Sequence, residues 1–236
     1  WNRVARNVAD AATPPSVSSA RSKRPKVWTA DQLRAFLDHV ADSRYLPAWI
    51  FLATAGCRRG EALGVKWVDV NLDLGTAVIS RQVTAIDHRV IVKDLPKTKH
   101  GHLIRLDGGT IAMLRRLRSE QAEEKLRLGP GYNDDGYVFC QWDGHPYHPE
   151  RFSREFDRNR EYFNRDHPDD PLPPITLHGL RHTWATLALS AGIDIKIVSE
   201  RLNHSSTTIT REIYTHVTPP MQSDAAERVA GLIRGT

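Results

Sequence analysis

The segment that most restricts the fold runs from residue 45 to residue 56 and reads YLPAWIFLATAG. It is apolar on nearly every face of a helix, so a helix formed here must be covered by protein on all sides. Gly56 is the residue type at which such a helix commonly ends. Because a chain of 236 residues can supply that cover, we expect a core built around one buried helix.

Helical patterns surround the buried segment along the chain. Thr29 and Gln32 form a capping-box pair at the start of an amphipathic stretch. A short helix is expected directly after Gly56. Further helical patterns cover residues 107–128 and 148–163 and resume after a proline-rich break at 167–176. Most of the chain is therefore predicted to be helical.

The middle of the chain has a different character. Residues 76–86, 88–95 and 100–106 are short, rich in β-branched side chains and separated by turn residues, which predicts a small antiparallel sheet. The tetrapeptide YVFC at 137–140 is expected to be a short buried strand. The predicted fold class is α+β, mainly helical, with one small antiparallel β-sheet at the edge of a helical domain.

The first 26 residues do not share these patterns. They are rich in Pro, Ser and basic residues and have no apolar period, so residues 1–26 are expected to form an extended linker. The chain begins at Trp1, and its first methionine is Met113. We therefore expect a fragment of a longer protein.

Charge and cysteine content restrict the partners and the compartment. The 33 Lys and Arg residues exceed the 28 Asp and Glu residues, and the resulting net charge of +5 favours polyanionic partners, nucleic acid first. Cys57 and Cys140 lie far apart without a CxxC spacing, which favours a reducing cytoplasm. No apolar run approaches the roughly 20 residues of a membrane span, so we expect no membrane partner.

Two groups of basic residues are candidates for binding phosphate, although each has an ordinary explanation. Arg58 and Arg59 follow the buried helix, where cations are common because of the helix dipole, and Glu61 can orient one of them. Lys97 and Lys99 lie in a turn between two predicted strands, where lysines also discourage aggregation.

Two further groups contain residues that can transfer protons, and the first of them also contains a cation. His178 and Arg181 are three residues apart at a helix start and so share a face, away from Leu180 and Trp184. His182 has no obvious partner. His204 lies at a junction between short helices, and Tyr214 follows ten residues later.

Taken together, these residues describe a site for a phosphodiester. Arginines can bind its non-bridging oxygens and stabilise the extra negative charge of the transition state. A histidine can accept the phenolic proton of Tyr214, and a lysine can protonate the departing oxygen. Surrounding positive charge lowers the pKa of a phenol, which makes Tyr214 a competent nucleophile.

The order of these segments resembles the catalytic domain of tyrosine recombinases of the phage integrase type. The matching stretches are TAGCRRGEALGVKW, PKTKHG, HGLRHTWAT and LNHSSTTITREIYTHV, and they fall within residues 27–217. The resemblance implies a catalytic domain at 27–217, a linker remnant at 1–26 from which an N-terminal DNA-clamping domain is missing, and a C-terminal tail helix at 218–236.

The resemblance also implies a role for each candidate. Arg58 corresponds to the first catalytic arginine, although Ala55 stands in the preceding turn. Glu61 corresponds to the supporting acid. Lys97 corresponds to the general acid, with Lys99 as the alternative. The remaining catalytic residues are His178, Arg181, His204 and Tyr214. Asn203 departs from the family, in which glycine is more usual.

The implied activity is site-specific recombination, the integration or excision of a phage or integrative element. Tyrosine attacks a DNA phosphodiester, a 3′-phosphotyrosyl intermediate forms, and a second strand's 5′-hydroxyl resolves it. No cofactor or metal is implied, and the sequence contains no Walker-type loop. The implied partner is double-stranded DNA, bound by a homotetramer that is monomeric when free. An excision factor or a host architectural protein is a further candidate partner.

Two alternatives remain open at the level of the sequence. A type IB topoisomerase shares the tyrosine and the cationic cluster, but the histidine of the HxxR motif favours the recombinase. A helix-turn-helix DNA-binding module without chemistry would use residues 191–214 but would not need the other cations.

Overall fold

The computed structural model describes residues 25–94 and 102–203. Within them the α-helices are α1 (Ala30–His39), α2 (Leu46–Ala55), α3 (Arg59–Leu63), α4 (Gly108–Leu128), α5 (Pro149–Asp166), α6 (Leu177–Ser190) and α7 (Ile195–Arg201). The strands are β1 (Val70–Asn71), β2 (Thr76–Ile79), β3 (Arg81–Ile86), β4 (Arg89–Asp94) and β5 (His102–Arg105). Short 3-10 helices lie at Trp67–Asp69, before β1, and at Gly129–Gly131, after α4.

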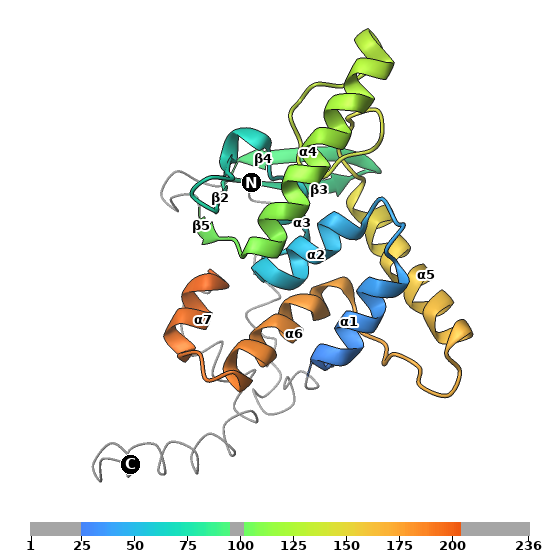
Figure 1. Cartoon of the computed structure of the whole chain (residues 1–236), viewed down its shortest axis with the longest axis vertical. Helices are drawn as coiled ribbons and strands as arrows, with labels where there is room; N and C mark the ends of the chain where they lie inside the picture. The colour runs from blue at the N-terminus through green and yellow to red at the C-terminus, as the bar shows by residue number, and fades with distance from the viewer. Residues whose placement is uncertain (1–24, 95–101, 204–236) are drawn as a thin grey trace, which may run out of the picture.

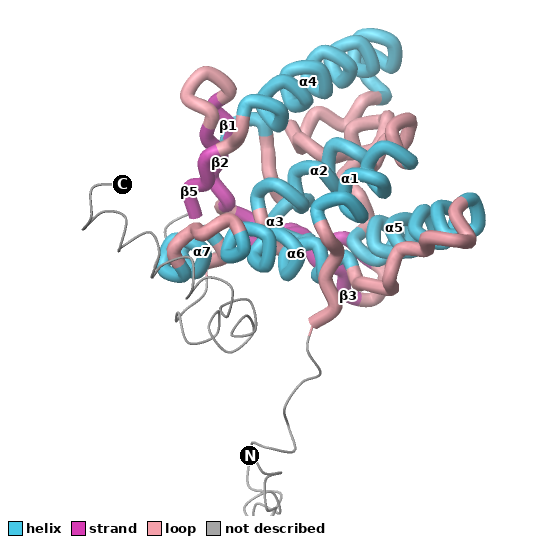
Figure 2. The backbone as a smooth tube through the Cα atoms, turned by 60° about the horizontal axis from the view of Figure 1, so that its bottom comes forward, coloured by secondary structure: helices cyan, strands magenta, loops and turns pink. Residues whose placement is uncertain are grey.

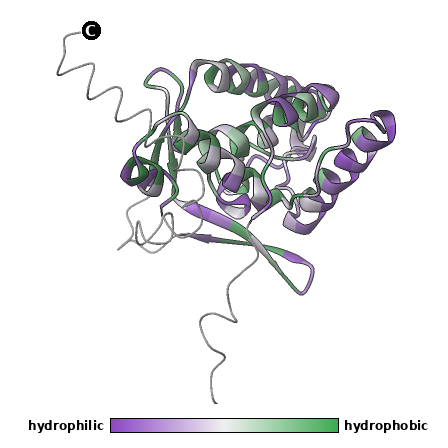
Figure 3. Cartoon of the chain, turned by 90° about the horizontal axis from the view of Figure 1, so that it is seen from below, coloured by the Kyte–Doolittle hydropathy of each residue, from purple (hydrophilic) through white to green (hydrophobic). Residues whose placement is uncertain are grey.

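The predicted buried helix is confirmed as α2, which lies at the centre of the fold with α4 on one side and α6 on the other (Figure 1). Trp49 is fully buried, and its ring packs against Phe36 of α1 at 5.6 Å and Phe156 of α5 at 6.1 Å between ring centroids. Apolar residues face the interior and hydrophilic residues the outside of the surrounding helices (Figure 3).

The predicted start of α1 is also confirmed. The Thr29 hydroxyl accepts a hydrogen bond from the backbone N–H of Gln32, and the Gln32 side chain accepts one from the backbone N–H of Thr29. These two bonds satisfy donors that a helix N-terminus otherwise leaves without partners. The segment before α1 is fixed as well, because the Trp28 indole donates to the carbonyl of Pro173 at 2.8 Å.

The single predicted sheet is replaced by two small antiparallel sheets. One has the strand order β1-β2-β5, and the other is the hairpin β3-β4. The strand predicted across residues 76–86 breaks at Ser80, where the Asp69 carboxylate accepts hydrogen bonds from the side chains of Ser80 and Arg81. Asp87 and His88 both have positive φ, as in the two-residue turns that fit a hairpin's twist.

A second correction concerns residues 137–140. They are buried as predicted, but they form only isolated bridges, between Lys66 and Tyr137 and between Cys140 and Pro146, and not a strand. The Gln121 side chain of α4 donates to the carbonyl of Val138 at 2.8 Å, so a side chain provides the partner that a neighbouring strand would have provided.

Among the helices of the described residues, none is both long and apolar enough to cross a lipid bilayer. Helices α3 and α6, at which described candidate residues lie, share one side of the molecule with α7 and β5 (Figure 2). This side is where the turn between α2 and α3 meets the start of α6.

Candidate active site

Arg58 and Glu61 form the best-defined pair of the site. One Glu61 carboxylate oxygen accepts the backbone N–H of Arg58, and the other accepts its guanidinium Nη1, each at 2.8 Å. Glu61 is 6% exposed, whereas the Arg58 side chain is 45% exposed. A buried carboxylate thus fixes the orientation of a guanidinium that still faces solvent. Arg59 points elsewhere, since its Nη1 donates to Ser153 of α5 at 2.6 Å.

Arg181 is buried between two helix ends and is only 3% exposed. Its Nη1 donates to the carbonyl of Gly56, which caps α2, at 2.9 Å, and its Nη2 donates to the carbonyl of Leu202, which caps α7. Helix C-termini carry partial negative charge, so both contacts favour the buried cation. The same side chain therefore joins three helices.

His178 lies one turn before Arg181, in the electrostatic field of both arginines. Burial of part of its ring lowers the pKa of His178, and the positive charges of Arg181 and Arg58 lower it further, whereas Glu61 acts in the opposite direction. The structure thus brings Arg58, Glu61, His178 and Arg181 together from two segments more than a hundred residues apart. Their candidate roles in chemistry remain predictions.

The His178 ring packs edge-on against His182, with 4.8 Å between the ring centroids. His182, for which the sequence indicates no obvious partner, is therefore a neighbour of the candidate site. The i,i+4 spacing of the two histidines places them on one helix face and could have indicated the contact.

Gly56 allows α6 to lie directly against the turn that carries Arg58. It has φ +69°, and a Cβ atom there would lie 2.8 Å from the Trp184 ring of α6. Only glycine combines this backbone conformation with so close an approach.

Two further residues at this place had no signal in the sequence. Arg201, at the end of α7, donates from Nε to the carbonyl of Ala55 at 3.2 Å and from Nη2 to that of Thr54 at 3.4 Å. Its guanidinium also lies 5.7 Å from the centre of the Trp184 ring. His102, the first residue of β5, has its Nε2 2.7 Å from the carbonyl oxygen of Arg201.

The other candidates, Lys97, Lys99, His204 and Tyr214, lie outside the described residues. The strands on either side of residues 95–101 are described. Residues 95–101 connect β4 to β5, and within the described residues these strands pair with β3 and β2 and not with each other.

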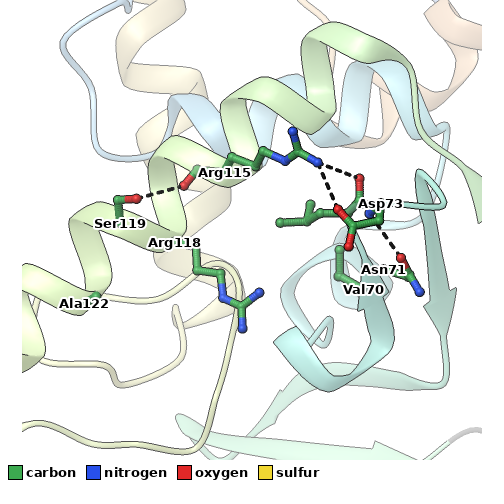
Figure 4. A pocket seen from close by; sticks show the side chains of 8 residues that line it. Val70, Asn71, Asp73, Arg115, Arg118, Ser119 and Ala122 are labelled. Carbon is green, nitrogen blue, oxygen red and sulfur yellow. Dashed lines mark hydrogen bonds and ion pairs between the residues drawn. The ribbon is translucent and has the colours of Figure 1, made fainter.

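Across residues 25–94 and 102–203, no three His, Cys, Asp or Glu side chains gather closely enough to hold a metal ion. A hollow between β1 and α4 is lined by Asn71, Asp73, Arg115 and Arg118, and Arg115 pairs there with Asp73 at 3.1 Å (Figure 4). None of the four described candidates, Arg58, Glu61, His178 and Arg181, lines this hollow, so it is separate from their cluster.

The sequence model of the phage integrase family matches residues 26–220. The chain belongs to the phage integrase family. It is therefore a tyrosine recombinase/integrase family enzyme, as the sequence predicted.

Relatives within this family cover different biological systems. The chain is 30% identical over 219 residues to a XerC-like tyrosine recombinase of Caldanaerobacter subterraneus, covering 88% of this chain and 54% of that protein. It is 28% identical to the ICEBs1 integrase of Bacillus subtilis, covering 89% of this chain and 56% of that protein. The chain thus spans about half the length of these relatives.

Solved structures of integrases have the same fold. The Tn1549 transposon integrase in complex with transposon right end DNA has a TM-score of 0.75 at 21% identity, covering 91% of this chain and 70% of that one. A lambda integrase dimer bound to a core site has a TM-score of 0.55 at 20% identity, covering 90% of this chain and 53% of that one. The predicted tyrosine-recombinase-type, mainly helical fold is confirmed.

Proposed function

We propose that this phage integrase family member catalyses site-specific DNA recombination with Tyr214 as the nucleophile. The observation that carries the proposal is the cluster of Arg58, Glu61, His178 and Arg181 on one side of the fold. One guanidinium is fixed yet open to solvent, a second is buried, and the charges of both act on the His178 imidazole. This combination suits a phosphodiester that gains negative charge in its transition state.

Each step of the proposed reaction uses one of these groups. The Tyr214 oxygen attacks the phosphorus, its proton passes to His204 or His178, and the bond to the 5′ oxygen breaks. Lys97, with Lys99 as the alternative, protonates that leaving oxygen, which leaves a 3′-phosphotyrosyl bond and a free 5′-hydroxyl. Attack by a second strand's 5′-hydroxyl reverses these transfers, so no external energy source is needed.

The proposed biological task is integration or excision of a mobile element in the cytoplasm. The 28% identity to the ICEBs1 integrase supports this task, whereas the 30% identity to a XerC-like recombinase does not separate it from other tasks within the family. The proposed partner is double-stranded DNA, bound by a homotetramer that forms from monomers on the DNA, with an excision factor or host architectural protein in addition. Residues 27–217 are the proposed catalytic domain, between a linker remnant at 1–26 and a tail helix at 218–236.

The proposal is tested with DNA that carries a suspected attachment site and a nick near the cleavage point, which traps the intermediate. The reaction contains EDTA, and denaturing gels then measure the covalent protein–DNA adduct. We expect adduct from the wild type and none from Tyr214→Phe. Adduct that survives in Tyr214→Phe would contradict the assignment of the nucleophile. Relaxation of supercoiled plasmid without joining of two sites would favour the topoisomerase alternative instead.

A further inference from the structure

The end of α7 is attached to the rest of the fold by contacts to three other elements. Arg201 donates to the Ala55 and Thr54 carbonyls of α2 and lies against Trp184 of α6. The last carbonyls of a helix have no partner within the helix, so this guanidinium satisfies acceptors that α2 itself leaves open. Burial lowers the pKa of Arg201, a cost consistent with a side chain that is packed rather than solvated.

The third contact joins the end of α7 to β5, in the sheet with strand order β1-β2-β5. The Nε2 of His102 lies 2.7 Å from the Arg201 carbonyl oxygen and donates a hydrogen bond to it. His102 is the first residue of β5 and follows residues 95–101, which contain Lys97. Through one residue, therefore, the end of α7 is tied to β5, to α2 and to α6 (Figure 2).

The carbonyls that receive Arg201 are themselves held in place. The hydroxyl of Thr54 lies 3.1 Å from that of Thr110, which donates to the Asp107 carboxylate at 2.6 Å at the start of α4. Arg201 is therefore fastened to a rigid part of the core and not to a surface loop.

We infer that Arg201 is a positioning residue for the recombination reaction, with His102 as its support. The inference rests on the proposed function. Helix α7 ends at Arg201, and His204 follows three residues later in the chain. By fixing the end of α7, Arg201 acts through His204, the candidate residue that follows, and orients it toward the turn that carries Arg58 and the helix that carries His178 and Arg181.

The first arm of the test measures position without any chemistry. Amide hydrogen exchange is compared for the wild type, Arg201→Gln and a control, Arg115→Gln, whose arginine donates to a backbone carbonyl, as Arg201 does, and to the Asp73 carboxylate, but in the separate hollow of Figure 4. We expect exchange in α7 to rise at least about tenfold in Arg201→Gln, with α5 within about twofold of the wild type. Unchanged exchange in α7 would overturn the positioning role.

The second arm measures single-turnover adduct formation at saturating DNA. We expect Arg201→Gln to slow it roughly 10- to 100-fold, with Arg201→Lys intermediate and Arg115→Gln unchanged. His102→Gln, which keeps a donor for the carbonyl, should retain more activity than His102→Ala.

A double-mutant cycle separates positioning from a general loss of stability. If Arg201 acts through His204, the penalty of Arg201→Gln should shrink to below about twofold in a His204→Gln background. An equal penalty in both backgrounds would overturn the inference. If the wild type forms no adduct, the proposed function fails, and the exchange arm still decides whether Arg201 holds α7.

Discussion

At the scale of the residue, burial separates two ion pairs with the same spacing. Arg58–Glu61 and Arg34–Asp31 are both three residues apart, but the Glu61 side chain is 7% exposed and the Asp31 side chain 88%. A carboxylate that accepts two hydrogen bonds away from water contributes more to stability than one that is solvated and screened.

We therefore expect Glu61→Ala to lower the free energy of unfolding by about 2 kcal/mol and Asp31→Ala by less than about 1 kcal/mol. Urea unfolding monitored by tryptophan fluorescence measures both changes. Equal losses for the two variants would show that the buried carboxylate of Glu61 has no special role.

The charges around His178 make its protonation a second test. Burial, Arg181 and Arg58 lower the pKa of His178 and Glu61 raises it, so Arg58→Gln should raise that pKa and Glu61→Gln should lower it. Nuclear magnetic resonance titration of the His178 ring measures both shifts. The opposite order would mean that the two side chains do not face the ring.

The same shift has a consequence for stability. Because the pKa of His178 is lower in the folded state, the unfolded chain takes up this proton first as the pH falls below about 6.5. His178 therefore contributes to a loss of stability as the pH falls from about 6.5 towards the folded-state pKa. His178→Gln should show a smaller loss in urea unfolding measured between pH 7 and pH 5.

The backbone conformation of Asn203 is a third feature that a single substitution can test. It has φ +50° directly after α7, a conformation that glycine adopts freely and asparagine tolerates. The departure from the family's usual glycine is thus conservative in backbone terms. Asn203→Gly should leave stability nearly unchanged, and Asn203→Ala should cost about 1 kcal/mol in urea unfolding. An alanine variant as stable as the wild type would contradict this explanation.

At the scale of the element, the contact between α2 and α6 depends on a glycine. Gly56 and Gly192 both follow helices with positive φ, at +69° and +80°, but a Cβ at Gly56 meets the Trp184 ring at 2.8 Å and one at Gly192 meets nothing within 4 Å. The loss of stability in Gly192→Ala should therefore reflect backbone strain alone, about 1–2 kcal/mol.

Gly56→Ala should cost at least about 1 kcal/mol more than Gly192→Ala, because the ring must move or the helices must separate. Thermal unfolding of both variants measures the difference. Equal costs would mean that Trp184 yields without effect on the packing of α6.

The elements also show how far the sequence predicts this structure. The buried helix, the Thr29 cap and α4 follow from local patterns, and local patterns are what a sequence displays directly. The break at Ser80 and the replacement of a strand at 137–140 do not follow, because both depend on side chains distant in sequence, Asp69 and Gln121. In the site, the spacing of Arg58 and Glu61 predicted their contact, whereas nothing in the sequence connects His102 to Arg201.

At the scale of the whole molecule, one side of the fold gathers the described residues that the proposed phosphoryl transfer would use. A fixed guanidinium, a buried one and a histidine with a lowered pKa come from two segments, and Arg201 and His102 tie α7 and β5 to the same place. The central claim is that this arrangement serves a tyrosine nucleophile at position 214.

The most direct measurement identifies the amino acid and the DNA end that are joined in the trapped adduct. Trypsin and nuclease digestion followed by mass spectrometry locates the nucleotide on the peptide. The account predicts a 3′-linked phosphotyrosine at Tyr214, in the tryptic peptide 212–228, and a free 5′-hydroxyl on the released strand, formed in EDTA. A nucleotide on any other residue, or a 5′ linkage, would contradict it.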